Sequence, residues 1–90
     1  ANKITDLTPL AKLTKLTTLN LTNNRITDLT PLAKLTKLTK LDLQNNAITN
    51  LTPLARLTNL KIMYLYDNPT PKDQKTMLKK ALPKCEIRFY

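Results

Sequence analysis

The stretch that decides the fold is Leu16-Thr17-Thr18-Leu19-Asn20-Leu21-Thr22-Asn23-Asn24, which follows the pattern L-x-x-L-x-L-x-x-N. The same pattern returns 22 residues later from Leu38 to Asn46. A third copy runs from Leu60 to Asn68, with Met63 in place of the middle leucine. A fixed period of this length is typical of a solenoid, in which each repeat packs only against its neighbours.

The two complete units, residues 4–25 and 26–47, predict which side of each repeat is buried. Three of their four differences alternate with leucines along the central stretch. In a strand, successive side chains point to opposite faces. We therefore expect short strands whose leucines face the core and whose variable residues face solvent. The four differing pairs are Thr18/Lys40, Asn20/Asp42, Thr22/Gln44 and Arg25/Ala47.

The second half of each unit contains a Thr-Pro pair, which predicts the start of a short helix of one to two turns. Threonine accepts a hydrogen bond at an N-cap, and proline fits the first helical position. The pairs are Thr8-Pro9, Thr30-Pro31 and Thr52-Pro53. Since the chain contains no glycine, we expect Asn or Asp at any turn position with positive φ.

One asparagine recurs at the corner after each predicted strand, at Asn24, Asn46 and Asn68. We interpret the three as a buried structural ladder that bonds backbone groups of its own and adjacent turns. An unpaired buried amide would cost about 1–3 kcal/mol. The pattern favours this role over ligand binding.

The two ends of the chain depart from the repeat. Ala1-Asn2-Lys3-Ile4 aligns with the start of a later turn, so the first unit is truncated and no N-terminal cap is recognisable. At the other end, residues 72–82 predict an amphipathic helix that Pro83 ends. A degenerate fourth strand follows, with Leu82, Cys85 and Ile87 expected in the register of the repeats. We expect repeats over residues 1–69 and a C-terminal capping unit over residues 70–90.

Composition limits the classes of function. Gly, Ser, Val, His and Trp are absent, which favours a consensus-derived or engineered origin, with a recent natural duplication as the alternative. The net charge of +9 favours solubility. No apolar run is long enough for a membrane span and no signal peptide opens the chain, so we expect a soluble domain in an unknown compartment. We expect no enzymatic activity, cofactor or metal, since the chain lacks Ser and His.

The repeat L-x-x-L-x-L-x-x-N-x-I-x-D-L-T-P-L-A-x-L-T-x resembles the 22-residue leucine-rich repeats of bacterial internalin-like proteins. The resemblance covers residues 2–69, and the end of the chain is similar to C-terminal units of bacterial leucine-rich repeat proteins. It implies an α/β solenoid with a parallel concave sheet, short convex helices and a helical C-terminal cap. It also implies protein binding on the sheet, in a family that is often secreted or attached to the cell surface.

The outward positions of neighbouring strands form the candidate protein-binding face. The third strand contributes its largest side chains, and tyrosine is enriched at interface hot spots. Ordinary packing between exposed strands is the alternative interpretation. We place Lys84 and Glu86 in the columns of Ile62 and Tyr64, and Arg88 in that of Tyr66. The candidate residues are Lys40, Asp42, Gln44, Ile62, Tyr64, Tyr66, Glu86 and Arg88.

A second hypothesis concerns the first coil, whose leucines we expect to be exposed at an uncapped end. Two such ends could meet around a two-fold axis and form a homodimer. The candidate residues are Leu7, Leu10, Leu13, Leu16 and Leu19.

Nucleic acid is disfavoured as a partner, because the basic residues come without a nucleic-acid-binding motif or interleaved aromatics. We expect the basic residues of the convex side to be solvated. On the concave face we expect a protein partner of unknown identity.

Overall fold

The computed structural model describes residues 3–90 and shows four stacked coils. Each coil contains one short strand and one helix. The helices are η1 (Thr8–Leu10), η2 (Thr30–Leu32), η3 (Thr52–Leu54) and α1 (Lys72–Ala81), and the strands are β1 (Thr18–Asn20), β2 (Lys40–Asp42), β3 (Ile62–Tyr64) and β4 (Glu86–Arg88).

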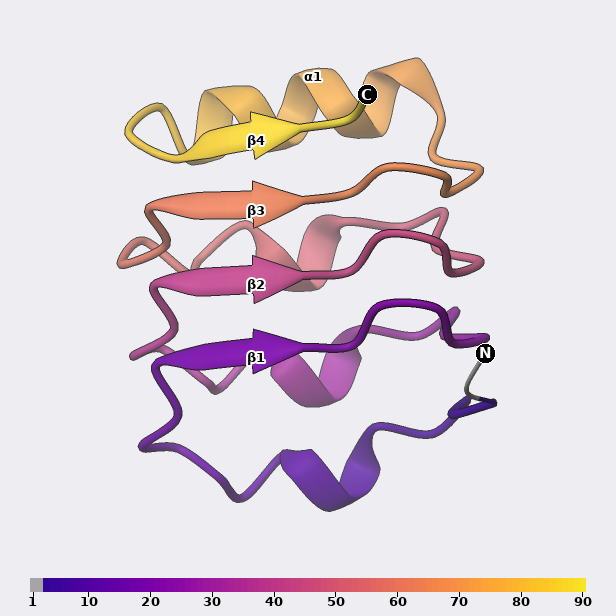
Figure 1. Ribbon diagram of the computed structural model, residues 1–90. Coiled ribbons are helices and arrows are strands. Elements are labelled where there is room, and N and C mark those ends of the chain that lie inside the picture. Colours follow the sequence, from indigo (N-terminus) through magenta and orange to yellow (C-terminus); the bar gives the residue numbers. More distant parts are fainter. Residues whose placement is uncertain (1–2) are drawn as a thin grey trace.

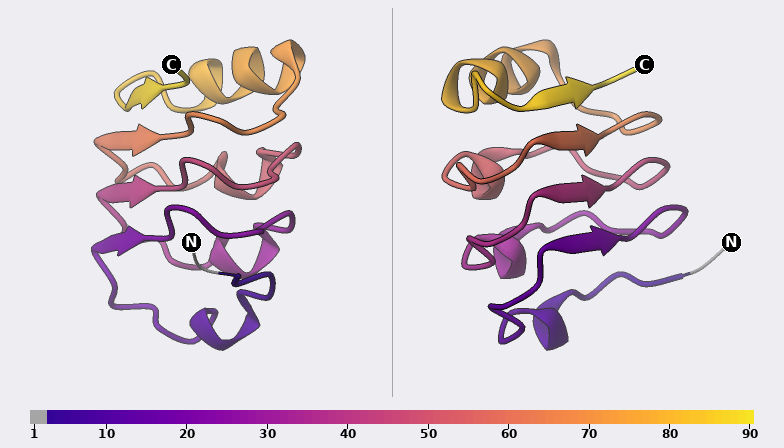
Figure 2. Two further views of the ribbon diagram at one scale, coloured as in Figure 1. Left: turned by 45° about the vertical axis from the view of Figure 1, so that its right-hand side comes forward. Right: turned by 60° about the vertical axis from the view of Figure 1, so that its left-hand side comes forward.

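The strands form one parallel sheet in the order β1-β2-β3-β4, and the helices lie behind it (Figures 1 and 2). Helices of consecutive coils contact each other on that far side. The expected α/β leucine-rich repeat solenoid with a parallel sheet is confirmed. Since each strand pairs only with its neighbours, the order of the coils in space is their order in the sequence.

The core is a column of aliphatic side chains between the sheet and the helices. The middle residue of each strand points inward, and Leu41 and Met63 are fully buried. The flanking residues of each strand point outward, as the alternation predicted. The outer face of the sheet is therefore free to vary without disturbing the core.

The three Thr-Pro helices are single 3-10 turns, and their caps differ from the prediction. The threonine does not accept a capping bond but is the first residue of the turn, with leucine at the N-cap. An acidic or amide side chain two residues earlier accepts the threonine N–H instead, as Asp28 does for Thr30 at 2.9 Å. Asp6 and Asn50 do the same in the other coils. These contacts fix the angle at which the chain enters each turn.

An asparagine side chain joins each coil to the preceding one. The Asn46 Nδ2 donates to the Leu21 carbonyl of the preceding coil at 2.9 Å and to Leu43 of its own at 3.0 Å. Its Oδ1 accepts the Ile26 amide at 3.1 Å. Asn68 repeats this arrangement one coil later, and Asn24 accepts the Ile4 amide.

The corner residues just before these asparagines adopt positive φ, as the sequence predicted for Asn and Asp. They are Asn23 (62°), Asn45 (60°) and Asp67 (54°). Their short polar side chains tolerate this conformation better than other non-glycine residues do. The corner therefore keeps its shape without glycine.

The last coil corrects the predicted register. β4 pairs Glu86 with Ile62 and Arg88 with Tyr64, two residues out of step with the 22-residue period. The ten-residue α1 replaces the three-residue 3-10 turn of the earlier coils. The last coil therefore needs two more residues than the 22-residue period before its strand begins. Ile87, not Cys85, is therefore aligned with Met63, and Lys84 lies in the loop before the strand rather than in a concave column.

Candidate concave binding face

The outward side chains of β2, β3 and β4 form one continuous surface, which we call the concave face. The strands place all of the predicted residues there. Lys40, Ile62 and Glu86 form one row across the sheet, and Asp42, Tyr64 and Arg88 form the next. Gln44 and Tyr66 follow just after their strands.

Two stacked tyrosines stand at the centre of this face. The ring centroids of Tyr64 and Tyr66 are 6.0 Å apart and their planes differ by 24°. Two cations approach the Tyr64 ring: the Lys40 Nζ lies 6.0 Å from its centroid and the Arg88 Cζ lies 5.9 Å from it. Such contacts contribute about 0.5–1 kcal/mol at exposed sites. They favour the observed orientation of the Tyr64 ring.

An ion pair borders the tyrosines on the side of the last strand. Arg88 donates to the Glu86 carboxylate through two guanidinium nitrogens, and both side chains remain about half exposed. The bond to Glu86, and after it the nearby Tyr66 hydroxyl, raise the pKa of Arg88. This pair therefore fixes the orientation of Arg88 beside the aromatic rings.

A hollow of about 220 Å³ lies beside the tyrosine patch, between β1 and β2. It exists because β1 presents the short side chain of Thr18 outward opposite the much longer Lys40, whereas Asn20 and Asp42 are equal in length. Next to it, the Asp42 Oδ1 and Gln44 Oε1 are shielded from solvent and accept no hydrogen bond from residues 3–90. The face thus combines partly exposed aromatic rings with a small hollow beside them.

The sequence identified the eight side chains but missed the hollow and the contacts around Tyr64. Thr18 and Asn20 stood in the predicted columns, yet small polar residues gave no signal of a depression. The signal was the small size of Thr18 relative to Lys40, its partner one repeat later. The cation–π contact of Arg88 was missed because the register of β4 was predicted two residues out of step.

The first coil is partly open, but not at every predicted residue. Leu7 is only 1% exposed, which corrects its assignment to the surface of this end. Leu10, Leu16 and Leu19 are partly buried against the core, whereas Leu13 is 45% exposed and Ile4 is 44% exposed. Within residues 3–90, no strand pairs with the outer edge of β1.

Cys85 lies half-buried in the loop before β4, and its thiol has no catalytic partner in the described chain. Burial, and after it the charge of Glu86, raises the pKa of Cys85 to about 11. A thiol that stays protonated at neutral pH is a poor nucleophile. In residues 3–90, no three His, Cys, Asp or Glu side chains come close enough together to hold a metal ion.

Comparisons with known proteins give the family. The profile described as "Leucine Rich repeats (2 copies)" matches residues 1–34 and 36–75. The chain belongs to the leucine-rich repeat family. Its structure is similar to internalin C2 of Listeria monocytogenes, with 39% identity, a TM-score of 0.86, and coverage of 99% of this chain and 38% of that one. It is an internalin-like leucine-rich repeat protein.

Two further solved structures share the architecture. An internalin (inlF) of L. monocytogenes is 28% identical with a TM-score of 0.62, covering 96% of this chain and 34% of its own. A leucine-rich repeat protein of Leptospira interrogans is 23% identical with a TM-score of 0.52, covering 98% of this chain and 35% of its own, and shows the fold alone. This chain thus spans little more than a third of each relative. No curated protein sequence matches it significantly, and no helix in residues 3–90 is long and apolar enough to cross a membrane.

The raised pKa predicts slow alkylation of Cys85. At about pH 8, a thiol of pKa about 11 is roughly one-thousandth ionised, so we expect native protein to react with iodoacetamide roughly a hundredfold more slowly than chain unfolded in guanidinium. The pKa of Cys85 in the folded protein lies above its ordinary value of 9.0. Protonation of the thiol therefore contributes stability below about pH 9 that is lost as pH rises through about 11. Equal native and unfolded rates, measured by mass spectrometry, would contradict this environment.

Proposed function

We propose that the chain is a non-enzymatic protein-interaction scaffold whose binding surface is the concave face. The single observation that supports this most is the stacked pair Tyr64 and Tyr66, flanked by Lys40 and Arg88. Tyrosine and arginine are the residues most enriched at energetic centres of protein interfaces. Both tyrosines are only partly covered, so their rings remain available to a partner.

The rest of the concave face supports a protein partner of mixed chemistry. The hollow between β1 and β2, lined by Thr18, Asn20, Lys40 and Asp42, can take a small side chain of the partner. The Glu86–Arg88 pair gives a polar border to the aromatic centre. An apolar centre with a polar border is the usual anatomy of a protein interface.

The origin of the chain is a separate matter from its function. We infer a consensus-derived or engineered sequence from the narrow alphabet and the near-identity of residues 4–25 and 26–47. Recent duplication of a natural repeat is the alternative. In either case the residues that differ between units are outward ones, which supports a role in display.

Removing both tyrosine rings tests the concave face. We expect Tyr64→Ala with Tyr66→Ala to weaken partner binding by at least about 2 kcal/mol, roughly thirtyfold, because the aromatic anchors are lost. Proteins captured by the immobilised wild type from cell extracts would be identified by mass spectrometry. The affinity of each would then be measured by surface plasmon resonance against both proteins.

The matched control is Thr27→Ala with Thr49→Ala, two exposed threonines in loops away from the sheet. It should retain every ligand at wild-type affinity. If the tyrosine variant binds those ligands as tightly as the control does, the concave face is not the binding surface.

The open end of the first coil supports a second candidate function, self-association. A hollow of about 320 Å³ there is lined mainly by apolar side chains, namely Ile4, Leu7, Pro9, Leu10, Leu19 and Leu21, with Asp6. In every later coil, the equivalent apolar surface is buried by the preceding coil. The same surface of the first coil is therefore suited to contact with another protein surface. The occupant we infer is a second copy, meeting this end around a two-fold axis.

Leu13 is the residue to change, because its side chain is 45% exposed, the highest value among the large apolar side chains of this end in residues 3–90. We expect the wild type to reach twice the monomer mass as concentration rises, and Leu13→Glu to remain monomeric, since burying one leucine stabilises an interface by about 1.5–3 kcal/mol. Light scattering over a wide concentration range measures both. Thr36→Glu, which adds the same charge to the second coil, should still dimerise. A wild type that stays monomeric throughout excludes this candidate.

A further inference from the structure

The net positive charge is concentrated on one side of the solenoid. We define the ascending flank as the four connections from each helix to the following strand, residues 11–17, 33–39, 55–61 and 82–85. It contains seven of the fifteen cations and none of the six acidic residues. The three connections from strands to helices, residues 21–29, 43–51 and 65–71, contain one cation and two acidic residues. The seven are Lys12, Lys15, Lys34, Lys37, Arg56, Lys61 and Lys84.

These seven cations are free to interact with another molecule. All of them are exposed. Within residues 3–90, the only ion pair joins Arg88 to Glu86, so none of the seven is neutralised by a neighbour. Their charges reinforce one another, because like charges on one side of a small protein add to a single field.

Hydrogen bonds hold the four connections side by side, along the left edge of Figure 1. The amide of Thr39 donates to the Thr17 carbonyl at 2.7 Å, and that of Lys61 donates to Thr39 at 2.8 Å. The Glu86 amide continues the series by donating to Lys61 at 2.8 Å. The cations of successive coils therefore form rows that run along the axis of the solenoid.

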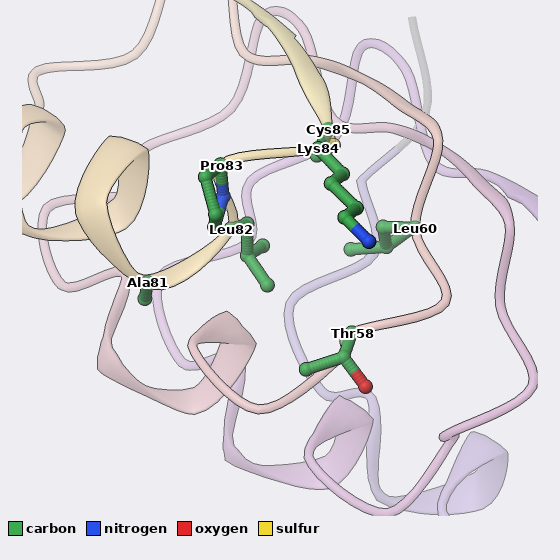
Figure 3. A pocket seen from close by; sticks show the side chains of 7 residues that line it. All are labelled: Thr58, Leu60, Ala81, Leu82, Pro83, Lys84 and Cys85. Atoms are coloured by element: carbon green, nitrogen blue, oxygen red, sulfur yellow. The ribbon is translucent and has the colours of Figure 1, made fainter.

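An apolar hollow of about 290 Å³ opens on this flank, between the third coil and the last (Figure 3). It exists because the connection after α1 has four residues, whereas the other three connections have seven. Leu60, Leu82 and Pro83 are among its walls, and Thr58 lies at its edge. The side chain of Lys84 extends across it towards Leu60.

We propose that the ascending flank binds an extended acidic peptide segment, with one large apolar side chain of that segment in the hollow. The rows of cations match a line of carboxylates, and the hollow is slightly smaller than the 300–1,000 Å³ of sites that enclose a whole ligand. Single-stranded nucleic acid is bound on aromatic platforms, and the flank contains no aromatic residue. An anionic polysaccharide has no apolar side chain to place beside Leu60.

The test uses a labelled twelve-residue peptide of glutamates with one central leucine, followed by fluorescence anisotropy at low and physiological salt. We expect binding that weakens as salt rises, and a peptide with serine in place of leucine should bind about fivefold more weakly, since one apolar anchor is lost. The double variant Lys37→Glu with Lys84→Glu should bind the leucine peptide at least about tenfold more weakly.

Two matched controls separate the flank from total charge and from folding. Arg25→Glu with Lys72→Glu changes the net charge equally, away from the flank, and should lose less than about threefold. Thr58→Tyr should fill the hollow and abolish the preference for leucine over serine, while Thr36→Tyr, one coil earlier, should retain it. Circular dichroism confirms that each variant is folded.

Three results would overturn the proposal. The first is equal weakening by the two charge-reversed variants, which indicates a nonspecific effect of net charge. The second is equal affinity for the leucine and serine peptides. The third is tighter binding of a twelve-nucleotide oligothymidylate than of the leucine peptide, which assigns the flank to nucleic acid. The variant Tyr64→Ala with Tyr66→Ala, which alters the concave face, should leave peptide binding unchanged. Failure of the flank proposal can therefore be distinguished from failure of the proposed concave binding face.

Discussion

The structure depends on one polar interaction, the side-chain amide that bridges successive coils. Asn46 and Asn68 each accept the amide N–H of the residue 20 positions earlier and donate to the carbonyl of the residue 25 positions earlier, in the preceding coil. The corner of a coil is irregular backbone, and without these bonds its buried polar groups would lack partners at about 1–3 kcal/mol each. The asparagine therefore sets the spacing and the orientation of neighbouring coils together. The leucines stabilise the stack, but the register between successive coils is set by these hydrogen bonds.

A fixed register between coils is what gives the surfaces their chemistry. A residue that recurs every 22 positions forms a row, and a change at that position alters one point of the row without moving the rest. Tyr64 stands beside Asp42 for this reason, and Lys34 follows Lys12 on the flank. Arg88 joins the row of Tyr64 only because β4 is shifted by two residues. The concave face and the ascending flank thus belong to the same coils but present different chemistry, one aromatic and mixed in charge, the other basic. Partners of different composition can then occupy them independently.

The sequence predicted most of the fold because the pattern is local and repeated. The L-x-x-L-x-L-x-x-N spacing led correctly to the strands, the inward leucines and the asparagines at the corners, and the lack of glycine led to positive φ at Asn23, Asn45 and Asp67. The register of β4 was wrong, because α1 interrupts the period and a helix of unknown length hides how many residues the coil needs. The capping of the 3-10 turns was wrong because Leu29, and not Thr30, occupies the N-cap position, and the amide of Thr30 donates to the Asp28 carboxylate. The hollows could not be predicted, since they depend on the lengths of connections and on differences in side-chain size between coils.

Native-state hydrogen exchange of the Ile26 amide tests the role of the asparagine bridges most directly. This amide donates to the Asn46 Oδ1 at 3.1 Å and to no helix or strand. We predict that it exchanges as slowly as the amides of β2 in the wild type, and that Asn46→Ala accelerates it by at least about tenfold, since a lost bond of about 1.4 kcal/mol or more lowers protection by that factor. Asn59→Ala, which removes an exposed amide that donates to Thr36 at 2.8 Å, should leave Ile26 unchanged. Rapid exchange of Ile26 in the wild type, or equal protection in wild type and Asn46→Ala, would show that the coils are held together without the asparagine bridge.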